Sequence, residues 1–189
     1  MNNQITKILS AKVNGRDTLD QVFNLMYPEI KKLANAQLSR LNTGQTITPT
    51  VLVNECYLKL TKPDSLSFEN RKHFICTVAK CMRQFLVDKV RRNMRLKRAA
   101  EISQEPITQI MGDKDINFKL LEIDEIINKL QMIDPEMAEL AELRFFSGHS
   151  LEEIAEIRNV SKRTIVRHWK MTKSFIITMN QEEKDNNDK

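Results

Sequence analysis

Residues 147–176 read SGHSLEEIAEIRNVSKRTIVRHWKMTKSFI and predict two helices joined by a tight turn. Ser150, followed three residues later by Glu153, forms a capping box that starts the first helix. Asn159 suits the turn because asparagine tolerates a positive φ. Ala155 is small, as required where two helices cross closely. The stretch therefore predicts a helix-turn-helix.

The second helix of this motif is predicted to begin near Lys162, capped by Ser161. Ile165 and Trp169 are expected on its inner face, and Val160 is expected to fill the gap between the two helices. The outer face carries no acid and comprises Lys162, Arg163, Val166, Arg167, Lys170 and Lys173. Such a helix can enter the major groove, where Arg reads guanine and Lys contacts phosphates. A generic helical hairpin is the alternative interpretation.

The positive charge of the chain is concentrated in two short segments. The whole chain has a net charge of only +5, yet residues 161–175 hold five Lys and Arg with no acid. Residues 80–98 hold eight basic residues against one Asp, and the block at 119–160 is acidic. Clustered Lys and Arg bind backbone phosphates by releasing counterions. A pair of solvated helix faces is the alternative.

The remaining sequence predicts an all-α protein. Apolar residues at helical spacing indicate helices at 18–41, 49–61, 71–98, from 120 to about 130, and from Pro135 to Phe146. Pro28 should kink or split the first of these. With four Gly and five Pro in 189 residues, a turn-rich β fold is excluded.

We expect two small helical domains joined by a flexible linker, the second a four-helix domain with the helix-turn-helix. The expected boundaries are residues 1–98 for the first domain, 99–118 for the linker, 119–178 for the second domain and 179–189 for a frayed polar tail.

Several classes of protein are excluded by what the sequence lacks. No apolar run is long enough for a membrane span, and the N-terminus has no export signal, so a bacterial cytoplasmic location is expected. The three cysteines are expected to be free thiols. There is no Gly-rich phosphate loop, no CxxC and no HExxH, and His73 with Cys76 lacks further ligands. We therefore expect no catalytic residue, no metal and no cofactor.

Three stretches resemble a known family. LEEIAEIRNVSKRTIVRHW resembles the fourth region of bacterial sigma factors, which reads the −35 element. LVNECYLKL is similar to the second-region helix that docks on core RNA polymerase, and HFICTVAKCMRQFLVDKVRRNMRLKR is similar to the helix that helps open the −10 element. The two-part chain resembles the extracytoplasmic-function (ECF) group, and TPTVLVNECYLKL resembles a subgroup whose members often read TPTALVHEAYLRL.

The resemblance implies a binding protein that directs promoter-specific transcription initiation and is not an enzyme. Its implied partners are core RNA polymerase and promoter DNA, with an anti-sigma factor as a further candidate. Polymerase contact is implied for Asn54, Glu55 and Lys59. Contact with −35 DNA is implied for Ser161, Lys162, Arg163, Val166, Arg167, Lys170 and Lys173. Contact with −10 DNA is implied for Phe68, Glu69, Asn70, Lys89, Arg91, Arg92, Arg95, Lys97 and Arg98, and Lys80 and Arg83 are further candidates for this track. Phe68 has a second possible role as a core anchor.

Two other functions remain open from the sequence. A stand-alone helix-turn-helix repressor or activator would need a dimerisation surface and a palindromic site. A module that only sequesters polymerase would need the docking helix but not the recognition helix. Dimerisation and binding of core polymerase distinguish these alternatives.

Overall fold

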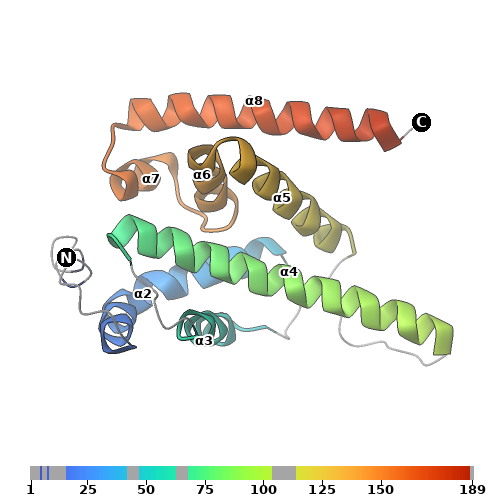
Figure 1. Ribbon diagram of the computed structural model, residues 1–189, viewed down its shortest axis with the longest axis horizontal. Coiled ribbons are helices and arrows are strands. Elements are labelled where there is room, and N and C mark those ends of the chain that lie inside the picture. Colours follow the sequence, from blue (N-terminus) through green and yellow to red (C-terminus); the bar gives the residue numbers. More distant parts are fainter. Residues whose placement is uncertain are drawn as a thin grey trace. The chain divides into compact units, whose positions relative to one another are not determined.

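The computed structural model describes Ile5, Ile8 and residues 16–41, 47–62, 68–103 and 114–187, and it describes side chains within 16–39, 47–62, 68–96 and 120–179. These ranges contain seven helices and no strand, which confirms the all-α prediction for the part of the chain they cover (Figure 1). The helices are α2 (Arg16–Leu41), α3 (Pro49–Leu60), α4 (Arg71–Ser103), α5 (Lys114–Ile133), α6 (Pro135–Phe145), α7 (Leu151–Arg158) and α8 (Lys162–Asn187).

The chain divides into two compact units, Met1–Leu121 and Glu122–Lys189. The boundary falls inside α5. Two parts of the expected linker are helical, because α4 continues to Ser103 and α5 begins at Lys114. The segment 104–113 lies outside the described residues.

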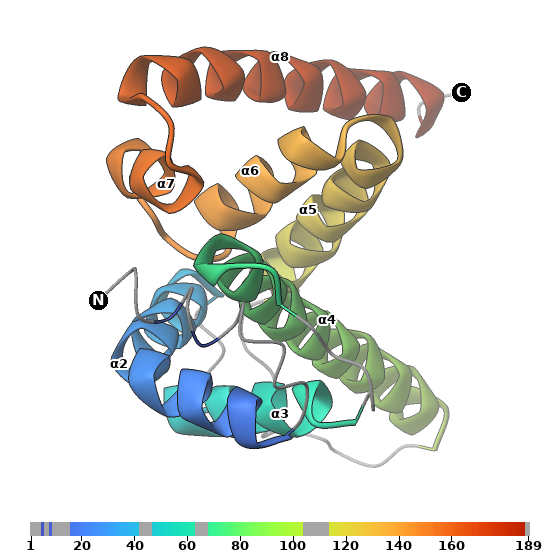
Figure 2. The same ribbon diagram turned by 60° about the vertical axis from the view of Figure 1, so that its left-hand side comes forward.

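In the first unit, α3 packs against both α2 and α4, and α2 also packs against α4 (Figure 2). An aromatic cluster joins the three helices: the ring of Phe23 on α2 meets Tyr57 on α3 edge-on at 5.2 Å and Phe74 on α4 at 6.3 Å. Each such pair adds about 0.5–1.5 kcal/mol to the burial of its rings. The long helix α4 runs on beyond the stretch that α2 and α3 cover (Figure 1).

Pro28 does not split the first long helix. It lies inside α2, which is continuous from Arg16 to Leu41, so the alternative of two helices is wrong. Just after the proline, the carboxylate of Glu29 accepts hydrogen bonds from Arg71 at 2.6 and 2.8 Å. This pair ties the middle of α2 to the start of α4.

In the second unit, α6, α7 and α8 pack against one another in all three pairings. An N-terminal cap starts α6, because Asp134 accepts hydrogen bonds from the amides of Glu136 and Met137 at 2.9 and 3.2 Å. Gly148, after α6, has a positive φ of 71°. Helix α8 continues to Asn187, within the stretch 179–189 that was expected as a polar tail.

Candidate nucleic-acid interface

The turn of the helix-turn-helix has the predicted backbone geometry. The Ser150 hydroxyl accepts from the Glu153 amide at 3.1 Å, and the Glu153 carboxylate accepts from the Ser150 amide at 2.8 Å, which completes the capping box. Asn159 ends α7 in the left-handed region, with φ 53° and ψ 45°. The Val160 amide then donates to the Ala155 carbonyl at 3.0 Å. These bonds fix where α8 starts relative to α7.

The prediction that Val160 fills the gap between the helices is wrong. Its side chain is 42% exposed, whereas Ile154 on α7 and Ile165 on α8 are fully buried. The left-handed residue at 159 and the bond from the Val160 amide close the turn through the backbone. The buried apolar residues of the motif therefore lie one turn inside each helix.

Arg158 is a structural residue of this motif that the sequence analysis missed. Its guanidinium donates to the Glu136 carbonyl at 2.7 Å and to the Glu139 carboxylate at 3.2 Å, so it joins the end of α7 to the start of α6. The side chain is only 5% exposed. No local pattern signals this role, because the partners lie 19 and 22 residues earlier in the chain.

The structure brings the basic residues of α8 together on an exposed face. We call Lys162, Arg163, Arg167, Lys170 and Lys173 the α8 basic face, and each of these residues is exposed. Val166, which lies among them, is half-buried. Ser161 has a structural role as the cap of α8, since its hydroxyl accepts a hydrogen bond from the Thr164 amide at 3.1 Å.

One residue of the α8 basic face has an acidic partner. Lys162 forms an ion pair with Glu152 on α7, and both side chains are more than half exposed. The hydrogen bond from Lys162, together with a backbone hydrogen bond, holds the pKa of Glu152 below its ordinary value. Glu152 therefore stays ionised at neutral pH and competes with phosphate for Lys162.

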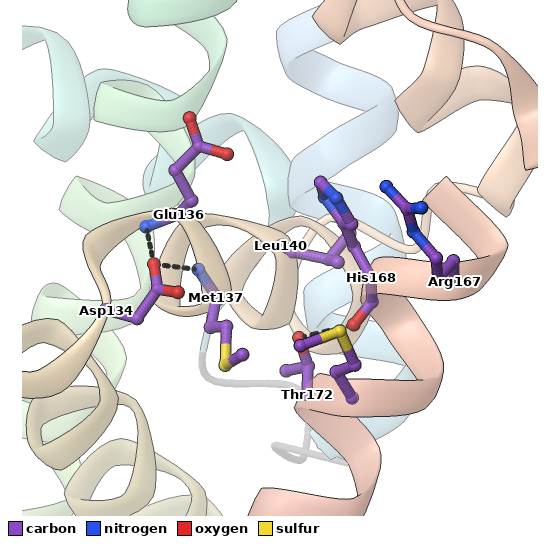
Figure 3. A pocket seen from close by; sticks show the side chains of 8 residues that line it. Asp134, Glu136, Met137, Leu140, Arg167, His168 and Thr172 are labelled. Carbon is purple, nitrogen blue, oxygen red and sulfur yellow. Dashed lines mark hydrogen bonds between the residues drawn. The ribbon is translucent and has the colours of Figure 1, made fainter. Parts of the chain in front are cut away.

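A pocket of about 400 Å³ lies between the start of α6 and the middle of α8 (Figure 3). Met137, Leu140 and Met171 give it an apolar wall, and Arg167 and His168 add polar groups from α8. The first amides of α6 are directed at the Asp134 carboxylate, as the dashed lines in Figure 3 show. The cap thus uses the donors that could otherwise bind an anion.

A second basic surface lies on the half of α4 that follows the apolar stripe. We call Lys89, Arg91, Arg92, Arg95, Lys97 and Arg98 the α4 basic segment. Arg91, Arg92 and Arg95 are exposed and Lys89 is half-buried. The side chains of Lys97 and Arg98 lie outside the described residues. Lys80, earlier on the helix, is exposed.

Arg83 does not lie on this exposed track, so its proposed DNA contact is wrong for this conformation. The residue is 1% exposed. Its position explains the burial, because Ala79, Leu86 and Val90 are all buried and lie four, three and seven residues away on the same helix face. The neighbouring basic residues in the sequence gave no indication that Arg83 faces inward.

Two of the residues before α4 already have structural roles, one in packing against α4 and one in capping it. Phe68 is 7% exposed and its ring meets Phe74 edge-on at 5.0 Å, which corresponds to its alternative role as a core anchor. The Asn70 side chain accepts from the His73 amide at 2.9 Å and so caps α4. Glu69 is exposed. Residues 63–67, the rest of this loop, lie outside the described residues.

One face of α3 is left exposed by the packing of the first unit. Val51, Asn54, Glu55 and Leu58 are exposed at helical spacing, and we call them the α3 outer face. Its two apolar members are 42% and 52% exposed, while Leu52, Val53, Cys56 and Leu60 are buried on the opposite side. The ammonium of Lys59 donates to Gln84 on α4 at 3.1 Å. Exposed apolar residues beside polar ones are typical of protein interfaces.

The described residues offer no site for a metal ion. They contain no group of three His, Cys, Asp or Glu placed to hold a metal ion. Among the helices in these ranges, none has the length and apolar run that crossing a bilayer requires.

Comparison with known protein families gives a match. The family model of the ECF sigma factor matches residues 2–184. No curated protein and no solved structure matched the chain. A match over nearly the whole length covers both basic surfaces and the α3 outer face. Sigma factors act by binding and are not enzymes. The chain therefore belongs to the ECF sigma factor family, whose members act with RNA polymerase in promoter-specific transcription initiation.

Proposed function

We propose that the two units divide the work of promoter recognition. The second unit is a helix-turn-helix domain that reads the −35 element with the α8 basic face. The first unit docks on core polymerase through α3 and opens the −10 element along the α4 basic segment. A flexible linker between the two domains, within residues 99–118, lets each reach its own element.

The observation that carries this proposal is the presence of three separate exposed surfaces in one chain. Two are basic and suit DNA, and the third, on α3, is mixed and suits a protein. A stand-alone regulator would have no use for the α3 outer face, and a sequestering module would have no use for the α8 basic face. Only a factor that bridges polymerase and DNA uses all three.

On α8, Arg163, Arg167 and Lys170 are the proposed base-reading residues, with Val166 between them. Arg can donate two hydrogen bonds to guanine O6 and N7, a pairing worth about 1–3 kcal/mol of discrimination against the wrong base. Lys162 and Ser161 are proposed phosphate contacts. Lys162 already pairs with Glu152, so phosphate competes with that carboxylate for the ammonium. The Ser161 hydroxyl accepts from the Thr164 amide and can still donate its own proton to phosphate.

On the first unit, the α4 basic segment is proposed to follow the backbone of separated strands. Glu69 and Asn70 are proposed contacts for an unpaired −10 base. Phe68 supports them from the core, where it holds the end of the loop against Phe74. Asn54, Glu55 and Lys59 are the proposed polymerase contacts, and Lys59 is already hydrogen-bonded to Gln84.

The motif TPTVLVNECYLKL favours the subgroup of ECF factors in which TPTALVHEAYLRL is common. We propose that the protein works in the bacterial cytoplasm, where its polymerase is found. An anti-sigma factor is a further proposed partner, and the α3 outer face is where it would compete with polymerase, since the apolar Val51 and Leu58 are open there.

Gel filtration with purified bacterial core RNA polymerase tests the docking. The wild-type chain should comigrate with polymerase, and Asn54→Ala/Glu55→Ala should weaken the complex. Gln21→Ala/Asn24→Ala is the matched control, because both of these residues are exposed polar residues on α2. If the chain does not bind polymerase but binds duplex DNA as a dimer, the proposal is overturned in favour of the stand-alone regulator.

A further inference from the structure

Two cysteines meet at the crossing of α3 and α4. Cys56 on α3 is fully buried and Cys81 on α4 is 5% exposed. The contact is reciprocal: the Cys56 sulfur lies 3.7 Å from the carbonyl oxygen of Val78 on α4, and the Cys81 sulfur lies 3.8 Å from the carbonyl oxygen of Cys56. Both thiols are free. Each sulfur therefore lies against a backbone carbonyl of the helix that carries the other cysteine.

The surroundings make these two thiols chemically unequal. Hydrogen bonding from Cys56 lowers the pKa of the Cys81 thiol, and Lys59 lowers it further. The same hydrogen bond, with burial, raises the pKa of Cys56. The pair thus gives up its first proton from Cys81 and holds the second firmly. Lys59 is kept close by its bond to Gln84, one helical turn after Cys81.

Buried thiols are normally inert because neither a charge nor an oxidant reaches them. This pair differs in having an adjacent second thiol and a nearby ammonium, both of which stabilise a thiolate. Access of an oxidant to the pair requires a local separation of α3 from α4.

We propose that Cys56 and Cys81 form a dithiol site that a hydroperoxide oxidises to an intramolecular disulfide between α3 and α4. The Cys81 thiolate attacks the distal oxygen of hydrogen peroxide, the O–O bond breaks, and the hydroxide released takes up a proton to become water. Cys56, losing its proton, then attacks the sulfenic sulfur, and the departing hydroxide becomes a second water. Two thiols are oxidised and one peroxide is reduced.

The disulfide would tie the proposed docking helix to α4 without covering its outer face. Val51, Asn54, Glu55 and Leu58 are exposed on α3 while Cys56 is buried, so the cross-link lies on the packed side. The inference about the thiols is independent of the proposed function, and the test below uses no polymerase or DNA.

The experiment treats the folded full-length chain with hydrogen peroxide, alkylates the remaining thiols after unfolding, and maps the peptides by mass spectrometry. The expected result is a fall from three free thiols to one, with a Cys56–Cys81 cross-linked peptide and an alkylated Cys76. A reductant should restore all three. The oxidised chain should melt higher by about 5 °C or more, because the cross-link restricts the unfolded chain.

Cys76→Ser is the matched control, as Cys76 is a buried cysteine on the same helix, and it should leave the cross-link intact. Cys56→Ser should stop the reaction at a sulfenic acid on Cys81, which dimedone traps. The wild-type peptide map is decisive even where a variant folds poorly. Three thiols surviving peroxide, a disulfide that includes Cys76, or one between two chains would each overturn the proposal.

Discussion

Arg158 has a structural role in a motif whose other basic residues face solvent. Its guanidinium donates to α6 at 2.7 and 3.2 Å, and 5% of the side chain is exposed. Arg158→Ala leaves the Glu136 carbonyl and the Glu139 carboxylate without this donor, so we expect a loss of about 1–3 kcal/mol in unfolding free energy. Urea denaturation followed by circular dichroism measures it.

Arg163→Ala is the matched control for that change. Arg163 is exposed on α8, so its removal should leave the urea midpoint unchanged while weakening DNA binding. Equal midpoints for the two variants would show that the bonds from Arg158 contribute nothing measurable to stability.

Glu152 pairs with Lys162 of the α8 basic face. Glu152→Gln removes the competing charge and frees the ammonium for phosphate. We expect tighter binding to a random-sequence duplex and a dependence of log Kobs on log salt that is steeper by about 0.9, the value for one added phosphate contact. Fluorescence anisotropy across a salt series tests this.

The carboxylate of Glu156 provides the comparison for Glu152, because it is exposed on the same helix. Glu156→Gln changes the net charge equally, so it separates a general charge effect from release of Lys162. If both variants steepen the salt dependence to the same degree, the ion pair is not what restrains Lys162.

At the scale of the element, the α3 outer face is the surface proposed to contact core polymerase. Leu58 is 52% exposed, so Leu58→Lys should cost the fold little. The same change places an ammonium in an apolar part of the proposed polymerase contact, and we expect binding to core polymerase to weaken about tenfold or more. Leu25→Lys is the control, since Leu25 is 45% exposed on α2. Equal affinities of the two variants, measured by titration, would contradict the assignment of α3.

The caps and turns of these elements were predictable because their causes are local. Thr48 accepts from the Val51 amide at 3.3 Å at the start of α3, and Asn159 adopts the positive φ expected of it. Each signal depends on residues within one helical turn of one another. The sequence pattern therefore predicted the starts of α3, α6, α7 and α8 correctly.

Contacts between elements were not predictable in the same way. Arg83 belongs to a basic run, yet its helix face packs inward, and the partners of Arg158 lie on another helix. The pairing of Lys162 with Glu152 crosses the turn of the helix-turn-helix. Which basic residues are available to DNA thus depends on tertiary packing, which a single sequence does not reveal.

At the scale of the whole molecule, positive charge is divided between the two units. The α8 basic face and the α4 basic segment lie on different units, and an acidic stretch at 119–160 separates them in sequence. Each surface should therefore contribute its own counterion release, and the contributions should add, because residues without shared partners behave independently.

This additivity can be measured on DNA of random sequence, since counterion release does not depend on base sequence. On random-sequence duplex DNA no base is read and both guanidinium groups contact phosphates instead, so Arg163→Ala/Arg167→Ala should reduce the salt slope by about 1.8, two contacts at about 0.9 each. Arg91→Ala/Arg92→Ala should act mainly on single strands, with a reduction of about 1.4, because each contact there releases about 0.7 counterions. The fourfold variant should show both reductions.

Lys31→Ala/Lys32→Ala on α2 removes an exposed basic pair outside both surfaces and should change neither slope. If all three pairs of substitutions lowered the slopes equally, binding would follow net charge alone, and the assignment of duplex DNA to α8 and separated strands to α4 would be wrong.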